Sequence, residues 1–135
     1  MVKTVTIRDR VILPGNPIDV YNAYIDAKLH AEFTGSPASS DPRVGGRFEA
    51  WGGYISGSYI ELVQGEKIVQ EWVSSDFPED AAPSRVEIVL RKVVDGVELT
   101  MVHSGVPEEI ADDIRKGWVD YYWDPLRDYL NGEHA

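Results

Sequence analysis

The chain has 135 residues, no cysteine, and a formal net charge of −10 from 23 acidic and 13 basic side chains. A chain of this length fits one domain with its own hydrophobic core, so we expect a single domain over residues 1–135. The lack of cysteine excludes disulfides, a thiolate nucleophile and a cysteine-based zinc site. The negative charge disfavours nucleic acid and anionic membrane surfaces as partners, and it indicates either solubility alone or a basic protein partner.

The start of the chain has no features of a secretory signal. Residues 1–5 alternate apolar and polar side chains and contain no apolar segment of the kind that a signal peptide needs. No apolar run approaches the roughly 20 residues of a membrane-spanning helix. We therefore expect a soluble, cytoplasmic protein.

The first third of the chain predicts one strand followed by two short helices. Apolar and polar side chains alternate over Thr4–Leu13, as in a half-buried strand, and the Pro-Gly-Asn-Pro sequence at 14–17 ends it. Helical spacing of apolar residues predicts short helices over Asp19–Ile25 and Ala27–Phe33. The segment Gly35–Gly46 is rich in glycine, serine and proline, and we expect a loop without a strand there.

The middle of the chain alternates with a period of two and predicts about five further strands in a meander. The first three begin at residues 47, 54 and 68. In the second of these, Ser58, Ile60 and Leu62 share the face opposite Glu61. The last two form a hairpin around Asp95-Gly96, a dipeptide favoured in type I′ turns. The inward positions of the hairpin are Val86, Ile88, Leu90, Val97, Leu99, Met101 and His103.

The end of the chain changes to the spacing of an amphipathic helix. Pro107 occupies a first helical position, and Glu108 and Glu109 follow in the first turn, where acidic side chains suit the helix dipole. On a helical wheel, one narrow sector contains Ile110, Ala111, Ile114, Trp118, Tyr121, Pro125 and Tyr129. This face must cover a sheet, and Pro125 should bend the helix because it removes a backbone hydrogen bond.

This order of elements predicts an α+β fold of the helix-grip type, in which a curved antiparallel sheet of about six strands wraps around a long C-terminal helix. Six segments also resemble the domain named for activators of the heat-shock protein 90 ATPase. They are AEFTGSPA (31–38), DPRVGGRF (41–48), GSYIELV (57–63), KIVQEW (67–72), GVPEE (105–109) and GWVDYYWDPL (117–126). The resemblance spans nearly the whole chain.

The resemblance implies a START-like domain of the SRPBCC class, related in fold to the birch-pollen allergen, with an elongated cavity between helix and sheet. In the eukaryotic co-chaperone it covers the C-terminal domain. The N-terminal domain that makes the main contact with the chaperone has no counterpart in these 135 residues. A role as a regulator of the heat-shock protein 90 ATPase is therefore one function that the resemblance implies.

Eight residues are expected to line the space between sheet and helix. They are Trp72, Ile88, Leu90, Met101, His103, Ile114, Trp118 and Tyr121. Ligand pockets are mostly apolar with a few polar groups, so these side chains could bind a hydrophobic small molecule. The alternative is that such bulky side chains close the space and form a filled core.

His103 and Asp9 both have inward parity on strands that this fold places side by side. An imidazole oriented by a carboxylate could act as a general base or bind a polar group of a ligand, or the pair could only satisfy itself. No serine lies in a nucleophile elbow, and the three histidines lack metal-ligand spacing. We therefore predict a non-enzymatic protein without metal or cofactor, with a hydrolase or cyclase that uses His103 as an alternative.

A second apolar stripe lies beside the first on the C-terminal helix and comprises Val119, Tyr122, Trp123, Leu126 and Leu130. One helix face cannot bury both stripes against one sheet, so some of these side chains cover the short helices or form a contact surface. Trp123 lies opposite the core sector and is the candidate for a dimer, chaperone or other partner contact. The alternative is that it packs on a neighbouring part of the chain.

Overall fold

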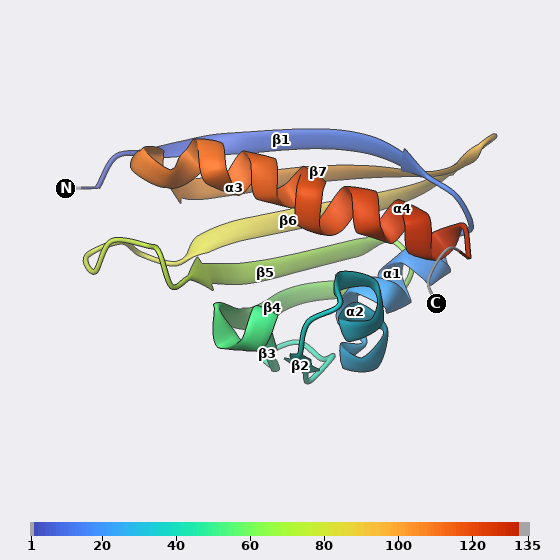
Figure 1. Ribbon diagram of the computed structural model, residues 1–135, viewed down its shortest axis with the longest axis horizontal. Helices are drawn as coiled ribbons and strands as arrows, with labels where there is room; N and C mark the ends of the chain where they lie inside the picture. Colours follow the sequence, from blue (N-terminus) through green and yellow to red (C-terminus); the bar gives the residue numbers. More distant parts are fainter. Residues whose placement is uncertain (1, 133–135) are drawn as a thin grey trace.

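The computed structural model describes residues 2–132 and contains one antiparallel sheet with helices on one face (Figure 1). The sheet has seven strands in the order β1-β7-β6-β5-β4-β3-β2. The strands are β1 Thr4–Leu13, β2 Ala38–Ser40, β3 Arg47–Ala50, β4 Ile55–Val63, β5 Lys67–Ser74, β6 Ser84–Val93 and β7 Gly96–Pro107. The edge strand β1 pairs with β7, the last strand of the chain, after which the C-terminal helical segment begins.

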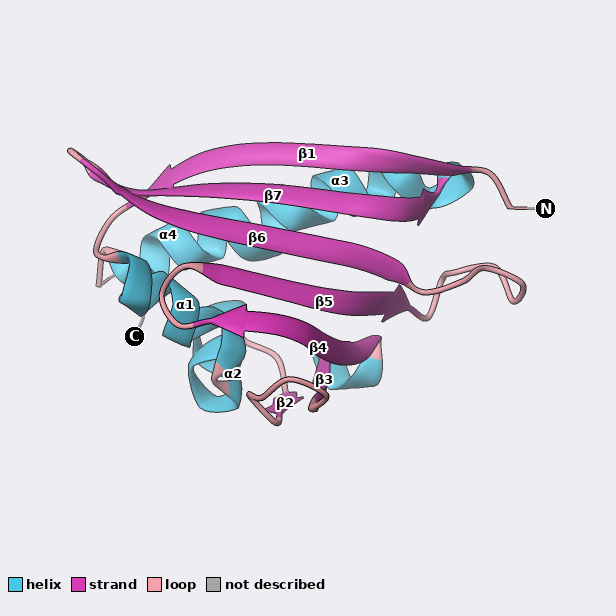
Figure 2. Ribbon diagram, turned by 180° about the vertical axis from the view of Figure 1, so that it is seen from behind, coloured by secondary structure: helices cyan, strands magenta, loops and turns pink. Residues whose placement is uncertain are grey.

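Two groups of helices accompany the sheet. The α-helices are α1 Pro17–Ile25, α2 Ala27–Thr34, α3 Ala111–Trp118 and α4 Asp124–Leu130; the shorter turns are η1 Trp51–Gly53, η2 Glu108–Ile110 and the π-helical η3 Val119–Trp123. The segment from α3 to α4 runs along the sheet over β1, β7 and β6 (Figure 1). Figure 2 shows the opposite face of the sheet, which no helix covers. The predicted helix-grip fold is therefore confirmed, with both short helices after the first strand.

The strand β2 is one more than the sequence predicts, because it lies within the segment that was expected to be a loop. It has only three residues, and Ala38 and Ser40 pair with Ala50 and Phe48 of β3. So short an edge strand has no alternating apolar pattern. Its pairing partner, rather than its own composition, makes it a strand.

A β-bulge in β4 reverses the faces that the sequence predicts for this strand. The register against β5 shifts between Tyr59 and Glu61. A bulge adds one residue to one strand, so the inward parity changes across it. Tyr59 is therefore buried and Ile60 is 42% exposed. The prediction that Ser58, Ile60 and Leu62 share one face was therefore wrong, because Leu62, beyond the bulge, packs against the core and Ile60 does not.

The C-terminal helical segment contains a π turn that changes which side chains face the sheet. In η3 the N–H of Asp124 bonds to the carbonyl of Val119, five residues back. Pro125 follows directly and has no N–H to continue the α-helical pattern. Because a π turn adds one residue, every later position is rotated relative to a regular helical wheel. The sequence predicts a bend at Pro125, and the feature that the structure has at this point is this change of helical register.

The rotation buries three residues of the second apolar stripe, leaves Val119 exposed, and exposes part of the first stripe. Tyr122, Trp123 and Leu126 are buried, whereas Tyr121 is 58% exposed. The ring of Tyr122 packs against Tyr24 of α1 and Phe33 of α2, with centroid distances of 5.9 Å to each. The second stripe thus covers the short helices, which was one of the two expected outcomes.

Trp123 lies inside the core, so the prediction of a partner contact there was wrong. Its side chain is 1% exposed and stacks on Trp118 at 5.3 Å with an interplanar angle of 14°. Its indole N–H donates to Asp9 Oδ2 at 2.8 Å. The predicted Asp9–His103 pair does not form, because the register places Asp9 opposite Met101 and Ile7 opposite His103.

We predict that the Asp9–Trp123 hydrogen bond holds β1 to the helix. Asp9→Ala leaves a buried indole N–H without an acceptor and should lower the free energy of unfolding by about 1–3 kcal/mol in urea titrations. The double variant with Trp123→Phe should show a coupling energy of about 1 kcal/mol, since the two residues act on one bond. Asp120→Ala on the exposed helix face is the control and should change stability by less than about 0.5 kcal/mol. Strictly additive effects would contradict this bond.

Within residues 2–132, no helix combines the length and the apolar character needed to cross a lipid bilayer.

Candidate ligand-binding cavity

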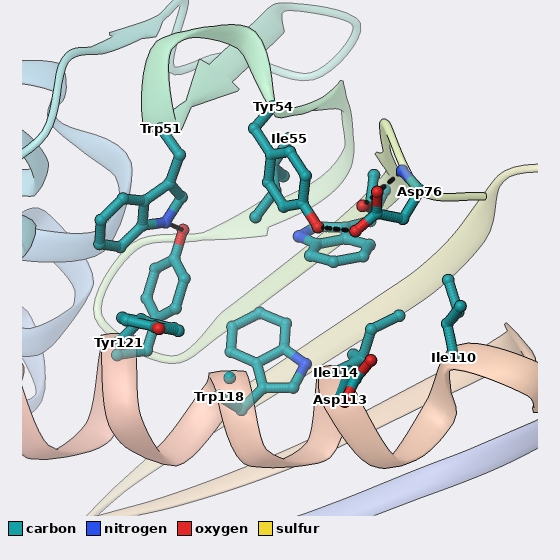
Figure 3. Close-up of a pocket in the computed structure, with 13 residues that line it drawn as sticks. Trp51, Tyr54, Ile55, Asp76, Ile110, Asp113, Ile114, Trp118 and Tyr121 are labelled. Atoms are coloured by element: carbon teal, nitrogen blue, oxygen red, sulfur yellow. Dashed lines mark hydrogen bonds between the residues drawn. The ribbon is translucent and has the colours of Figure 1, made fainter.

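A cavity of about 300 Å³ lies between α3 and the part of the sheet where β4 begins and β5 ends (Figure 3). Its volume is at the lower end of the range of small-molecule pockets. The lining residues are Trp51, Tyr54, Ile55, Trp72, Ser74, Asp76, Ile110, Asp113, Ile114, Gly117, Trp118, Tyr121 and Tyr122. Six of these thirteen side chains are aromatic, so the walls are rigid and largely apolar.

Two tryptophans from opposite layers form the floor of the cavity. Trp72 belongs to β5 and Trp118 to α3, and their ring centroids lie 5.8 Å apart. Both side chains are nearly fully buried. The contact between sheet and helix is therefore aromatic on both sides at this point.

A strained turn supplies a further wall. Trp51 begins η1 with φ of 56°, in the left-handed region that a residue with a side chain rarely adopts, and Gly52 and Gly53 continue with positive φ. Such a conformation costs of order 1 kcal/mol and needs compensating contacts. The indole N–H of Trp51 donates to the Tyr122 hydroxyl at 3.3 Å, and its ring packs edge-on against Tyr121 at 5.5 Å. These contacts hold the Trp51 side chain against the helix.

The hydroxyl of Tyr122 belongs to a chain of hydrogen bonds whose direction can be assigned. His30 Nδ1 lies 2.8 Å from the carbonyl of Tyr24, so this nitrogen carries the proton. His30 Nε2 then accepts from the Tyr122 hydroxyl at 3.1 Å. Burial lowers the pKa of His30 and raises that of Tyr122, so both groups stay neutral. The Trp51 wall is thus connected to α2 through uncharged groups.

A second chain of hydrogen bonds lies beneath the floor and contains His103. The indole N–H of Trp118 donates to His103 Nδ1 at 3.0 Å, so the ring proton is on Nε2, which donates to Ser84 Oγ at 2.8 Å. Ser84 in turn donates to the carbonyl of Trp72 at 2.6 Å. Burial lowers the pKa of His103 to about 3, and the side chain is 0% exposed. His103 therefore positions the two tryptophans and has no contact with the cavity.

Two carboxylates lie at one end of the cavity, and Figure 3 shows them across from each other, with Trp51 and Tyr121 at the other end. Asp113 projects from α3, and Asp76 lies in the connection between β5 and β6. The hydroxyl of Tyr54 donates to Asp76. This hydrogen bond raises the pKa of Tyr54, and the negative charge of Asp113 acts in the same direction. The end of the cavity is therefore acidic.

The structure divides the eight residues that were expected to line the cavity. Trp72, Ile114, Trp118 and Tyr121 do so. The other four, Ile88, Leu90, Met101 and His103, are buried in the closed core. The filled core and the cavity thus coexist at different positions along the helix. The core is closed where the large side chains of the second stripe, such as Trp123 and Leu126, fill the space between helix and sheet.

Sequence reasoning missed the outer wall, namely Trp51, Tyr54, Asp76 and Asp113. The Trp-Gly-Gly sequence at 51–53 was a usable signal, because consecutive glycines permit the positive φ values of this turn. Nothing local to Asp76 marks it, since it lies in a polar connection that only the fold brings to the helix. Among residues 2–132 there is no group of three or more histidine, aspartate or glutamate side chains that could hold a metal ion.

The curved antiparallel sheet, the long C-terminal helix and the cavity between them define a helix-grip domain of the START-like class. The chain belongs to the family described as Activator of Hsp90 ATPase homolog 1-like protein, whose profile matches residues 15–131. This confirms the family that the sequence motifs predict.

Known proteins agree with this assignment. The human activator of 90 kDa heat shock protein ATPase homolog 1 is 28% identical over 112 residues, which are 83% of this chain and 33% of that protein. The homolog from Dictyostelium discoideum is 31% identical over 106 residues, 76% of this chain and 27% of that protein. This chain thus spans about a third of the length of these relatives. The crystal structure of an HSP90 activator from Plasmodium falciparum matches with a TM-score of 0.80 at 24% identity, covers 96% of each chain, and shows the same fold.

We predict that acid destabilises the protein through His103. The folded-state pKa of this group lies near 3, below the usual value of about 6.5, so the unfolded chain takes up the proton first as the pH falls. The contribution of His103 to the free energy of unfolding should be fully present above about pH 6.5. The free energy of unfolding should then decrease by roughly 1 kcal/mol per pH unit between pH 6 and 4. The lowered pKa of His30 acts in the same direction.

Urea titrations of the protein and of His103→Gln at pH 7, 6, 5 and 4 measure this effect. Glutamine can accept from Trp118 and donate to Ser84 but does not titrate, so the variant should lose stability less steeply as the pH falls. Carboxylates contribute equally to both proteins and cancel in the comparison. Parallel pH profiles would exclude His103 as the cause.

Proposed function

We propose that the cavity binds a small aromatic or apolar molecule without converting it. The observation that carries this proposal is a preformed space of about 300 Å³ between six aromatic side chains. Aromatic walls favour flat apolar ligands through buried area and ring contacts. No group in the cavity has the arrangement of a nucleophile with its base, and His103 is sealed below the floor.

The indole N–H of Trp72 supports the proposal. It is the one buried side-chain nitrogen or oxygen within residues 2–132 that has no hydrogen-bond partner. Buried donors are nearly always satisfied, and an unsatisfied one costs free energy. Trp72 lines the cavity but its nitrogen has almost no accessible surface, so an acceptor atom on a bound molecule would reach this N–H through a small movement of the surrounding rings.

Gly117 supports it from the helix. Glycine within a helix costs about 1 kcal/mol relative to alanine. A Cβ added here would meet only Tyr121 Cδ2 at 3.7 Å, an ordinary contact, so helix packing does not require glycine at this position. Since Gly117 is part of the cavity wall, its advantage is the space that it leaves there.

Ligand binding is tested with two bicyclic probes, the neutral 1-naphthylmethanol and the cationic 1-naphthylmethylamine. In ¹⁵N-correlated NMR spectra, at least one probe should shift the indole N–H signals of Trp51 and Trp72 in a saturable way. The signal of Trp123, which is bonded to Asp9 away from the cavity, serves as the internal reference. If neither probe shifts the Trp51 and Trp72 signals, the proposal is wrong.

Substitutions on α3 test the location. Gly117→Leu should weaken binding at least about tenfold, since it fills space that the ligand needs. Lys116→Leu adds the same side chain at an exposed position outside the cavity and should leave the affinity unchanged. Gly117→Ala should raise the free energy of unfolding by about 0.5–1 kcal/mol through helix propensity.

A second proposed function is regulation of the ATPase of a heat-shock protein 90 homologue. It is supported by the family and by the names of the human and Dictyostelium relatives. Adding the purified chain to such a chaperone should raise its ATPase rate until a complex is saturated. Gly117→Leu, which fills the cavity, is the matched variant. If it stimulates the ATPase as strongly as the unmodified chain does, the contact with the chaperone lies on the outer surface and not in the cavity. No change in rate and no complex in analytical ultracentrifugation would rule this function out.

A further inference from the structure

We infer that the ligand of the cavity is a cation, in which an ammonium group is attached to a flat aromatic or apolar body. This inference rests on the proposed ligand-binding function and concerns the chemical class of the ligand. It follows from the charges at the end of the cavity and from the aromatic faces next to them.

All the charge that lines the cavity is negative. Asp76 and Asp113 are its only ionisable acids, and no lysine, arginine or histidine is among the lining residues. Neither carboxylate has an ion-pair partner within residues 2–132. Other acids of the same helical segment do have one: Asp112 pairs with Arg115 and Asp124 with Arg127. Asp120 and Asp128 of this segment also lack an ion pair within the described residues, so the two cavity acids are distinguished by their position, where no basic side chain is among the lining residues.

The two carboxylates come from different layers and converge on the same end of the cavity (Figure 3). Asp113 is carried by the first part of α3, opposite the β5–β6 connection that carries Asp76. The hydrogen bond from Tyr54 fixes the orientation of the Asp76 carboxylate, and its backbone N–H is held by Ser74 Oγ at 3.1 Å. A positive group between Asp76 and Asp113 would be attracted by both.

The aromatic walls favour the same sign of charge. The faces of indole and phenol rings carry negative electrostatic potential and attract cations, with tryptophan the most effective. Trp72, Trp118 and Tyr54 all line the cavity together with the two acids. An anion would be repelled by these faces and by both carboxylates, whereas a neutral ligand would gain the ring contacts but no electrostatic attraction.

A metal ion is a poorer match than an organic cation. Divalent cations take six or more oxygen ligands, usually with several carboxylates, whereas the cavity offers two acids beside apolar rings. The walls can bury an organic body, and the exposed acids leave the ammonium group in contact with water. The cavity therefore suits an aromatic or alkyl ammonium compound.

Three probes of similar shape and different charge test the inference: the cation 1-naphthylmethylammonium, the neutral 1-naphthylmethanol and the anion of 1-naphthaleneacetic acid. Isothermal titration calorimetry at pH 7 and low salt should give the cation about tenfold tighter binding than the alcohol, and the anion the weakest. The preference for the cation over the alcohol should shrink in 0.5 M NaCl, because the acids are partly exposed and are screened.

Substitution of the two acids identifies the source of the preference. The double variant Asp76→Asn/Asp113→Asn should bind the cation and the alcohol with affinities within about twofold of each other. Asp112→Asn, one residue from Asp113 but directed to solvent and paired with Arg115, should keep the tenfold preference. Both positions are exposed, so folding is not at risk, and thermal unfolding verifies this.

The outcomes separate this inference from the function on which it rests. If the alcohol binds as tightly as the amine in the unmodified protein, the cavity is a ligand site but the cation inference is wrong. It is also wrong if the double variant retains the preference. If none of the three probes binds, both the inference and the proposed ligand-binding function fail.

Discussion

The contact between the Trp118 indole and the sheet determines where the C-terminal helix lies. Trp118 is 2% exposed, donates its N–H to His103 of β7, and stacks on Trp123. Because His103 is bonded through Ser84 to the backbone of β5, one chain of hydrogen bonds joins the helix to three strands. A buried network of this kind stabilises only one arrangement, since any displacement leaves a polar group unsatisfied. The floor of the cavity is therefore rigid.

The π turn next to Trp118 gives the helix two different faces. Before it, Ile114 and Trp118 face the cavity; Trp123 at its end and Leu126 beyond it enter the core. Tyr121 is left partly exposed at the rim, while its neighbour Tyr122 reaches the short helices. Such a turn often accompanies functional sites, because it changes the direction of side chains without ending the helix. Here it separates an open cavity from a filled core on a single helical segment.

The acidic side chains behind the net charge of −10 differ in whether a basic side chain lies beside them. Some surface acids form ion pairs, such as Glu98, which lies between Arg10 and Arg91. The cavity acids have no such neighbour. The composition alone suggested solubility or a basic partner, and the two acids at the cavity are the basis on which we propose a small positively charged ligand. His103, the residue of the alternative hydrolase or cyclase hypothesis, lies beneath the floor of the cavity, where it is bonded to Trp118 and Ser84.

The sequence by itself predicted six of the seven strands, the short helices and the C-terminal helical segment, together with their order, the helix-grip fold and the family. These depend on local periodicity, on turn residues such as Asp95-Gly96, and on motifs that a single chain displays. It also identified Trp72, Ile114, Trp118 and Tyr121, because strong alternation and helical spacing place them on inward faces.

Only the tertiary structure revealed the bulge in β4, the strand β2, the π turn and the outer wall of the cavity. A bulge or a π turn adds one residue without a signature in composition, yet it changes the face of every residue that follows. The Asp9–His103 pairing was wrong for a related reason, since the strand register depends on contacts along the whole of β1 and β7. Trp123 could be assigned to the core, and Asp76 and Asp113 to one end of the cavity, only when segments distant in the chain were brought together. Periodicity is a local property, whereas register and convergence are set by packing between elements.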